Sequence, residues 1–89
     1  MTFEEQVTAI LDDIHEMLLE KNKAYGNSAL NPVRIFSKAS ASEQLRVRID
    51  DKLSRLARGS NAGEDVVRDL IGYLVLLRIA EPKRGKVKK

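Results

Sequence analysis

Residues 65–79 read Asp-Val-Val-Arg-Asp-Leu-Ile-Gly-Tyr-Leu-Val-Leu-Leu-Arg-Ile and form the most apolar stretch of the chain. On a helix these apolar side chains fall on nearly every side, and a helix of that kind is buried on all sides. Two further helices from an 89-residue chain cannot cover it completely. The stretch therefore predicts a homo-oligomer, most simply a dimer in which this third helix packs against its copy. Gly72 would permit a close approach of the two backbones at that contact.

The two ends of the third helix can be read from the sequence. Asn61 followed by Glu64 is a capping pattern, so we expect the helix to begin there. Pro82 cannot continue a helix, so we expect the end near Ala80.

An amphipathic helix is predicted at the start of the chain. Thr2 and Glu5 form a capping box that opens it, and Gly26 stops it. Its apolar side chains recur at helical spacing and form one stripe: Phe3, Val7, Ile10, Leu11, Ile14, Met17, Leu18 and Tyr25. This stripe is expected to face the core.

A second helix is predicted in the middle of the chain. It opens at Ser40 or Ser42, with Ser40 and Glu43 forming another capping box, and Gly59 ends it. Its core stripe consists of Leu45, Ile49, Leu53 and Leu56.

The fold class that these patterns predict is all-α, a compact bundle of three main helices assembled as a homo-oligomer through the third. Residues 27–40 have no clear period and include Asn31-Pro32, so we expect a short helical or irregular connection there. Residues 1–82 are expected to form a single helical domain and residues 83–89 a basic flexible tail.

Composition and charge limit the kinds of site and the cellular location that we expect for this protein. Cysteine is absent, so disulfides and thiolate metal sites are excluded. The net charge is +3, and the last seven residues alone carry five basic side chains, so the remainder is mildly acidic. A basic tail can hold nucleic acid, although such tails more commonly solubilise a chain end. With no leader pattern and no apolar run near 20 residues, we expect a cytoplasmic protein without membrane contact.

Two ridges of charged and polar side chains flank the predicted core stripes. Arg48, Lys52 and Arg55 recur at helical spacing on the second helix. A matching ridge on the third helix consists of Asp65, Asp69 and Tyr73. If the ridges face each other, one interpretation is a set of salt bridges between the helices. The other is that the basic ridge overhangs a cavity and binds phosphate, with Asp69 and Tyr73 organising it.

Carboxylates raise the question of magnesium, because hard cations prefer oxygen ligands. Asp12, Glu16 and Glu20 align at four-residue spacing, but they lie opposite the apolar stripe of the first helix. We therefore expect them to form a solvated acidic face. Asp65 and Asp69 are the remaining candidates for metal ligands, and Mg²⁺ is expected only if the chain is an enzyme. No catalytic set can be assembled from the sequence.

The end of the first helix and the connection after it carry side chains suited to a base and a sugar. Tyr25 offers a ring for stacking, Asn27 and Ser28 offer neutral donors and acceptors, and Arg34 offers a guanidinium group. The same residue types also form turns, and both interpretations stay open.

Three motifs follow one another in the chain: Tyr25-Gly26, then Ile49 with Lys52, Arg55 and Leu56, then Asp69-Leu70 with Tyr73. In this order, over residues 15–77, they resemble the nucleotide-modification-associated helical domain family of phages and bacteria. The resemblance implies a nucleotide-like ligand in a phage setting, hence the host-cell cytoplasm, without fixing a reaction. The family often has Asp before Tyr-Gly, where this chain has Ala24. A more distant similarity is to MazG-like nucleotide pyrophosphohydrolases, which hold Mg²⁺ with acidic pairs on two helices.

The function expected from the sequence is a small oligomeric protein that binds a phosphate-bearing nucleotide or cyclic nucleotide. Sequestering a nucleotide signal of host immunity and serving nucleotide or DNA modification are two uses that the resemblance implies. Capture is favoured over catalysis. The alternatives are a Mg²⁺-dependent, MazG-like nucleoside triphosphate pyrophosphohydrolase and a nucleic-acid-binding accessory protein acting through the basic tail.

Overall fold

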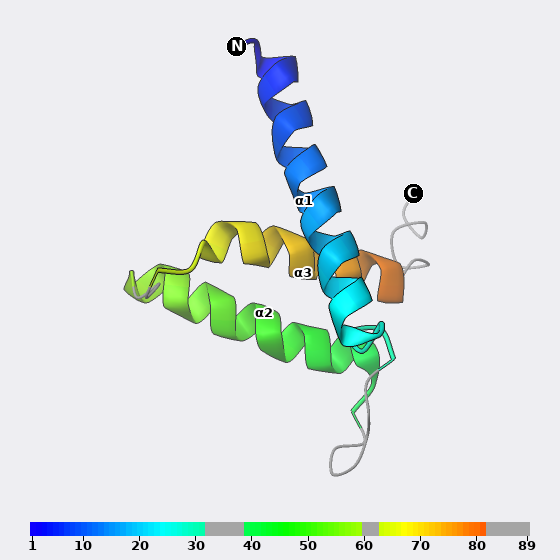
Figure 1. The fold of residues 1–89 in the computed structure, drawn as a ribbon. Helices are drawn as coiled ribbons and strands as arrows, with labels where there is room; N and C mark the ends of the chain where they lie inside the picture. The colour runs from blue at the N-terminus through cyan, green and yellow to red at the C-terminus, as the bar shows by residue number, and fades with distance from the viewer. Residues whose placement is uncertain (32–38, 60–62, 82–89) are drawn as a thin grey trace, which may run out of the picture.

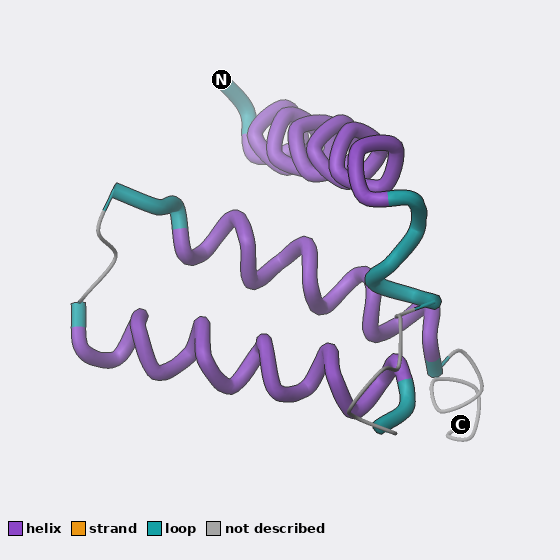
Figure 2. The backbone as a smooth tube through the Cα atoms, turned by 60° about the horizontal axis from the view of Figure 1, so that its bottom comes forward, coloured by secondary structure: helices purple, strands orange, loops and turns teal. Residues whose placement is uncertain are grey.

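The computed structural model describes residues 1–31, 39–59 and 63–81. Within these ranges the chain forms three helices: α1 (Phe3–Tyr25), α2 (Ala41–Arg58) and α3 (Val66–Ala80). The helices α2 and α3 lie side by side and antiparallel, and α1 crosses α3 (Figure 1). Seen along its axis, α1 lies on one side of the layer that α2 and α3 form (Figure 2). The predicted all-α class with three packed helices is confirmed.

The sequence predicted the caps of α1 and α2 correctly. The Thr2 hydroxyl accepts from the Glu5 backbone N–H at 3.1 Å, and the Glu5 carboxylate accepts from the Thr2 N–H at 2.8 Å. Gly26 then ends α1 in the left-handed conformation, with φ of 62°. Ser40 caps α2 as predicted by accepting from the Glu43 N–H at 3.2 Å, but the Glu43 side chain does not return the contact to the Ser40 N–H, so the described residues form only half of the predicted capping box. A left-handed glycine also follows α2.

The predicted start of α3 is wrong, and the reason is a competing cap. The helix begins at Val66, and its N-cap is Asp65, whose carboxylate accepts from the Arg68 N–H at 3.0 Å. Since Asp65 takes the capping position, Glu64 is left to bind cations on α2. Asn61 lies outside the described residues. The predicted end of the helix at Ala80 is confirmed.

The buried core is small and is divided between the α2–α3 contact and the crossing of α1 over α3. Its hydrophobic members in the described ranges are Ile14, Met17, Leu45, Ile49 and Val66. Only the second half of the α1 stripe reaches this core, because α1 crosses α3 instead of running alongside it (Figure 1). The first half of the stripe is exposed, and Phe3 is 82% exposed. The expectation that the whole stripe faces the core is therefore wrong for a single chain.

Gly72 marks the point where α1 and α3 approach each other. A Cβ atom at this position would lie 2.8 Å from Met17 Cε and 3.4 Å from Leu18 Cδ2. The close approach that the sequence placed between two chains is thus made inside one chain. A glycine costs helix stability, and here its lack of a side chain lets the two helices touch.

The turn after α1 leads the chain away from the crossing. Gly26 and Asn27 both have positive φ, and the N–H groups of Leu30 and Asn31 donate to the Asn27 carbonyl at 3.2 and 3.0 Å. Arg34, a predicted ligand residue, lies outside the described ranges. No helix in the described part of the chain combines the length and apolar character needed to cross a bilayer.

Gly72→Leu should destabilise the fold by about 1–3 kcal/mol, because the new side chain has no space beneath Met17 and Leu18. Gly72→Ala is the matched control, since the flexible end of Met17 can move and alanine gains about 1 kcal/mol of helix propensity. Urea denaturation followed by circular dichroism measures both. A leucine variant as stable as the alanine variant would show that the helices do not meet closely at this position.

Candidate functional site

A cavity of about 360 Å³ lies between the C-terminal half of α1 and the middle of α3. The turn after α1 closes one side, and one side chain of α2 reaches it. The cavity is lined by Met17, Leu18, Lys21, Asn22, Tyr25, Ser28, Ala29, Arg48, Asp69, Gly72, Tyr73 and Leu76. It therefore forms next to the α1–α3 crossing and depends on it.

The lining divides into an apolar part and a polar part. Met17, Leu18 and Leu76 supply hydrocarbon surface, and Gly72 adds backbone without a side chain. The polar part combines two tyrosines, one amide, one hydroxyl, two cations and one carboxylate. This is the composition typical of small-molecule sites, where apolar walls bind a ring and a few polar groups orient it.

Arg48 is the cation at this cavity that has no partner within the part of the chain that the structure describes. Among the described residues it makes no hydrogen bond or ion pair, and its side chain is exposed. A guanidinium group presents five donors in a planar fork and matches phosphate or carboxylate geometry. Arg48 can therefore receive an anion without giving up an existing contact.

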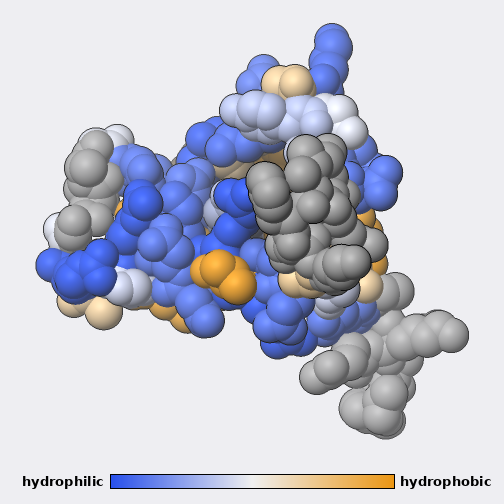
Figure 3. Space-filling view, turned by 90° about the horizontal axis from the view of Figure 1, so that it is seen from below, coloured by the Kyte–Doolittle hydropathy of each residue, from blue (hydrophilic) through white to orange (hydrophobic). Residues whose placement is uncertain are grey.

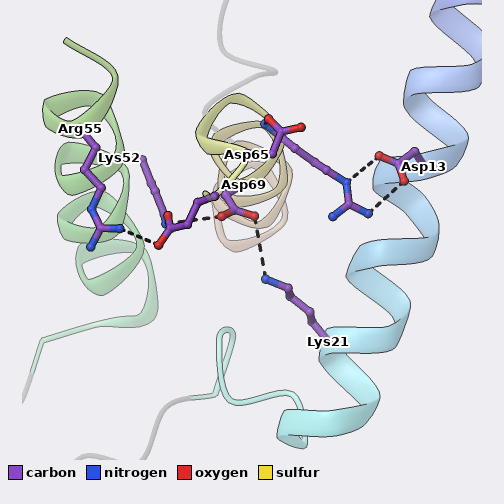
Figure 4. A network of polar contacts seen from close by, with 8 residues as sticks. Asp13, Lys21, Lys52, Arg55, Asp65 and Asp69 are labelled. Carbon is purple, nitrogen blue, oxygen red and sulfur yellow. Dashed lines mark hydrogen bonds and ion pairs between the residues drawn. The ribbon is translucent and has the colours of Figure 1, made fainter. Parts of the chain in front are cut away.

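The other cavity cation, Lys21, is only loosely engaged. Its ammonium nitrogen lies 4.0 Å from Asp69 Oδ1, at the edge of ion-pair distance. The Asp69 carboxylate also receives Lys52 Nζ from α2 at 3.5 Å. Asp69 thus sits between two lysines on different helices (Figure 4), and Lys21 keeps most of its donor capacity.

Beside the cavity, Glu64 binds the basic ridge of α2. Lys52 Nζ donates to Glu64 Oε1 at 2.9 Å, and an Arg55 guanidinium nitrogen donates to Glu64 Oε2 at 2.8 Å (Figure 4). Arg55 also pairs with Asp51 one turn earlier at 3.2 Å. The Lys52 side chain is only 12% exposed, so its contacts with two carboxylates compensate a largely covered charge.

These contacts shift the titration of the groups involved. The Lys52 ammonium and the Arg55 guanidinium donate to Glu64 and hold the pKa of its carboxyl below the ordinary value. The hydrogen bond to Glu64 in turn raises the pKa of Lys52. Both groups therefore stay charged across the physiological range.

A second ion pair fixes α1 on α3. The Arg68 guanidinium donates to both carboxylate oxygens of Asp13, at 2.7 and 2.9 Å. This bidentate contact lowers the pKa of Asp13 and sets the orientation of α1 about one turn from Gly72. Since α1 forms one wall of the cavity, the pair also positions that wall.

The structure brings together five of the predicted ligand residues: Tyr25, Ser28, Arg48, Asp69 and Tyr73 line the cavity. Three described residues of the prediction are not in its lining. Asn27 lies in the adjoining turn, and Lys52 and Arg55 are held in the network with Glu64.

Sequence reasoning missed two polar residues of the cavity and two residues of the ion pairs around it. Lys21 and Asn22 precede Tyr25 by one turn and share its helix face, a signal that the spacing contains. Glu64 was assigned to a cap that Asp65 provides. The partner of Asp13 could not be found from the sequence because Arg68 is 55 positions away.

The two candidate metal ligands, Asp65 and Asp69, are each engaged in a different contact. Asp65 caps α3, and Asp69 lies between two lysines. The described ranges contain no group of three or more His, Cys, Asp or Glu side chains placed to share a cation. Asp12, Glu16 and Glu20 are exposed, as the helical wheel predicts for a solvated face.

A second hollow, of about 400 Å³, lies where the end of α2 meets the start of α3. It is shallower than the first, and its charged side chains Arg55, Glu64 and Asp65 already serve in ion pairs or as a cap. The cavity at the α1–α3 crossing is therefore the better candidate site.

Acid should weaken the fold through Glu64 and Asp13, whose folded pKa values are both lowered. A lowered carboxyl pKa adds stability above the unfolded value, and this is lost as the pH falls through the folded value. The free energy of unfolding should thus decline below about pH 4.5, the ordinary value for Glu64. Urea titrations across this range should show a shallower decline for Glu64→Gln. Equal declines in both proteins would contradict the role of Glu64.

Comparison with protein-family models, with curated proteins and with solved structures finds no match to this chain. The site therefore has to be interpreted from its own geometry.

Proposed function

We propose that this chain binds a small phosphate-bearing nucleotide, linear or cyclic, in the cavity between α1 and α3. The observation that carries the proposal is the Arg48 guanidinium, which has no partner among the described residues and lies beside two tyrosines and an apolar floor. A nucleotide combines a flat ring with an anion, and this cavity offers a surface for each.

The cavity residues divide naturally among the parts of such a ligand. The Tyr25 and Tyr73 rings and the hydrocarbon of Leu18 suit a base, because aromatic and apolar contacts tolerate any purine or pyrimidine face. Arg48 and Lys21 suit the phosphate. Their charge-assisted hydrogen bonds are the strongest that the cavity can offer.

The sugar and the size of the ligand fit the same arrangement. Asn22 and Ser28 offer neutral donors and acceptors for hydroxyl groups, and Asp69 adds an acceptor held between two lysines. The volume of about 360 Å³ falls within the range of small-molecule pockets, at its lower end. A mononucleotide is therefore better matched than a long oligonucleotide.

The proposal gives Lys52 and Arg55 a supporting role instead of the direct phosphate contact expected from the sequence. Both are engaged with Glu64, and Lys52 also reaches Asp69. Withdrawing them for a ligand would leave a carboxylate without its partners. Lys52 is better suited to fixing Asp69 at the edge of the cavity, and Arg55 to holding Glu64 beside it.

Capture of the ligand is favoured over its hydrolysis. Asp65 and Asp69, the candidate acids on α3, already serve as a helix cap and an ion-pair centre. For a chain that resembles a phage family, capture of a host nucleotide signal is one use, and supply of a nucleotide to DNA modification is another.

We further propose a homo-oligomer, because α3 keeps exposed apolar side chains such as Val67 and Leu74. The tail proposed for nucleic-acid contact lies outside the described residues.

Arg48→Ala should weaken nucleotide binding roughly 10- to 150-fold, the value of a charged hydrogen bond of about 1.5–3 kcal/mol. Isothermal titration with a panel of mononucleotides and cyclic dinucleotides measures the affinity. Arg58→Ala is the matched control, because Arg58 lies on the same helix, contacts Ser54, and is not in the cavity lining. Unchanged affinity in the Arg48 variant would refute this cavity as the site.

Capture and turnover are separated by recovering the ligand. The protein is incubated with Mg²⁺ and each nucleotide that binds, then denatured, and the nucleotide is identified by mass spectrometry. Capture predicts intact ligand in proportion to protein. Release of monophosphate and pyrophosphate beyond one equivalent would establish the hydrolase alternative.

Lys52→Met tests the supporting role of that lysine. The substitution leaves Glu64 and Asp69 without the ammonium group, and the thermal midpoint should fall by about 4–8 °C for each kcal/mol lost. Affinity for the same nucleotides, measured where the variant is folded, should change far less than in Arg48→Ala. A stable variant with strongly reduced affinity would instead place Lys52 on the phosphate.

A further inference from the structure

Asp69 contributes a carboxylate to the cavity that the described residues form between α1 and α3. Its side chain is 21% exposed, so it is largely covered. Lys52 Nζ lies 3.5 Å from its Oδ2 atom, and Lys21 Nζ lies 4.0 Å from its Oδ1 atom (Figure 4). An ionised carboxylate has about four acceptor positions. The two ammonium groups therefore leave Asp69 with acceptor capacity for a ligand.

The charge of Asp69 limits which part of a nucleotide can lie next to it. A phosphate there would place two negative charges side by side, which is unfavourable where water is partly excluded. An ionised carboxylate also has no proton to donate, so it cannot bind a carbonyl oxygen or an acceptor nitrogen of the base. The group that Asp69 can bind is an uncharged donor, either a hydroxyl of the sugar or an N–H of the base.

Asp69 lies between the residues that we propose for the base and for the phosphate. Tyr73 follows Asp69 by one turn on the same face of α3, and both line the cavity. Arg48 precedes Lys52 by one turn on α2, and Lys52 contacts Asp69. Residues one turn apart on a helix have Cβ atoms about 5–6 Å apart. Since the sugar joins the base to the phosphate, the sugar is the part that meets Asp69.

The surroundings of the cavity fit the same order of groups. Leu18 on α1 and Leu76 on α3 provide apolar surface that would cover a base. Arg48 comes from α2, and the molecule seen from below, where α2 faces the viewer, is mostly hydrophilic (Figure 3). A phosphate at Arg48 would therefore remain near water, which lowers the free-energy cost of placing its charge there.

We infer that Asp69 accepts a hydrogen bond from the ribose 2′-hydroxyl, so that the cavity selects ribonucleotides over 2′-deoxyribonucleotides. This assignment rests on the proposed function and identifies the class of nucleotide that the same cavity takes. The 2′-hydroxyl is present in linear and in 3′,5′-cyclic ribonucleotides, and it distinguishes RNA from DNA chemistry. With deoxyribose in its place, the Asp69 carboxylate would lose water without gaining a donor.

The selection has a consequence for the two uses proposed above. The precursors of DNA lack the 2′-hydroxyl that Asp69 would bind. A cavity that selects for this group therefore favours the capture of a ribonucleotide signal over the supply of a nucleotide to DNA modification.

The wild-type protein tests the selection without any substitution. Isothermal titration is carried out with AMP, GMP and 3′,5′-cyclic AMP, and with the 2′-deoxy form of each. A ribonucleotide should bind roughly 10- to 150-fold more tightly than its 2′-deoxy form, the value of a hydrogen bond to a charged group. Equal affinities for the two forms would overturn the inference.

Asp69→Asn and Glu64→Gln form a matched pair that assigns the selection to Asp69. Each variant replaces a carboxylate that contacts Lys52 by its amide, but only Asp69 lines the cavity. Asp69→Asn should lower the ratio of ribonucleotide to deoxyribonucleotide affinity at least about 5-fold, because an amide forms a weaker, neutral hydrogen bond. Glu64→Gln should leave this ratio unchanged. Thermal midpoints establish the temperature at which both variants are folded.

Two results from the variants would contradict the role of Asp69. One is a ratio that Asp69→Asn leaves unchanged, or that Glu64→Gln lowers equally. The other is a preference for GMP over AMP that disappears in Asp69→Asn, which would place a guanine N–H at the carboxylate instead of the sugar.

The proposed function is tested separately by Arg48→Ala. If Arg48→Ala weakens binding while ribonucleotides and deoxyribonucleotides bind equally, the site stands and the selection by Asp69 is refuted. If no nucleotide binds, or if Arg48→Ala leaves the affinity unchanged, both the site and the selection are refuted.

Discussion

The crossing of α1 over α3 is the contact on which the rest of the structure depends. It combines a steric condition, the absence of a side chain at Gly72, with an electrostatic one, the bidentate pair of Asp13 and Arg68. The helices α2 and α3 form a layer of their own, but the cavity needs α1 as a wall. If α1 were displaced, Tyr25 would leave Tyr73, and the apolar floor would be opened to water.

Electrostatics divide the basic side chains of the chain into two groups. Lys52 and Arg55 both donate to Glu64, and Arg68 donates to Asp13, so these three cations are paired within the fold. Arg48 has no partner in the described ranges, and Lys21 has only a long contact. Because a salt bridge at an exposed position contributes little stability, leaving Arg48 and Lys21 without a strong ion pair costs little. They are the two cavity cations available to an external anion.

The sequence predicted most of the local structure and less of the site, for a physical reason. Caps such as Thr2 with Glu5 are local contacts, and helical spacing identified Leu45 and Ile49 as core residues, whereas Leu53 and Leu56 of the same predicted stripe are exposed. How much of the α1 stripe would be buried depended on the crossing with α3, which no local pattern encodes. The same holds for Glu64, whose role followed once Asp65 took the cap. Tyr25, Arg48 and Tyr73, which the sequence assigned to one candidate site, line one cavity, and each lies on a predictable helix face.

The environment of Lys52 also has a consequence for its chemical reactivity. Only the neutral form of an amine attacks electrophiles, and the contact with Glu64 raises the pKa of Lys52 and so reduces that form further. Its side chain is 12% exposed, whereas that of Lys21 is 55% exposed. Acylating reagents used to label or immobilise this protein should therefore modify Lys21 at the cavity well before Lys52, and surface attachment through amines would compete with access to that cavity.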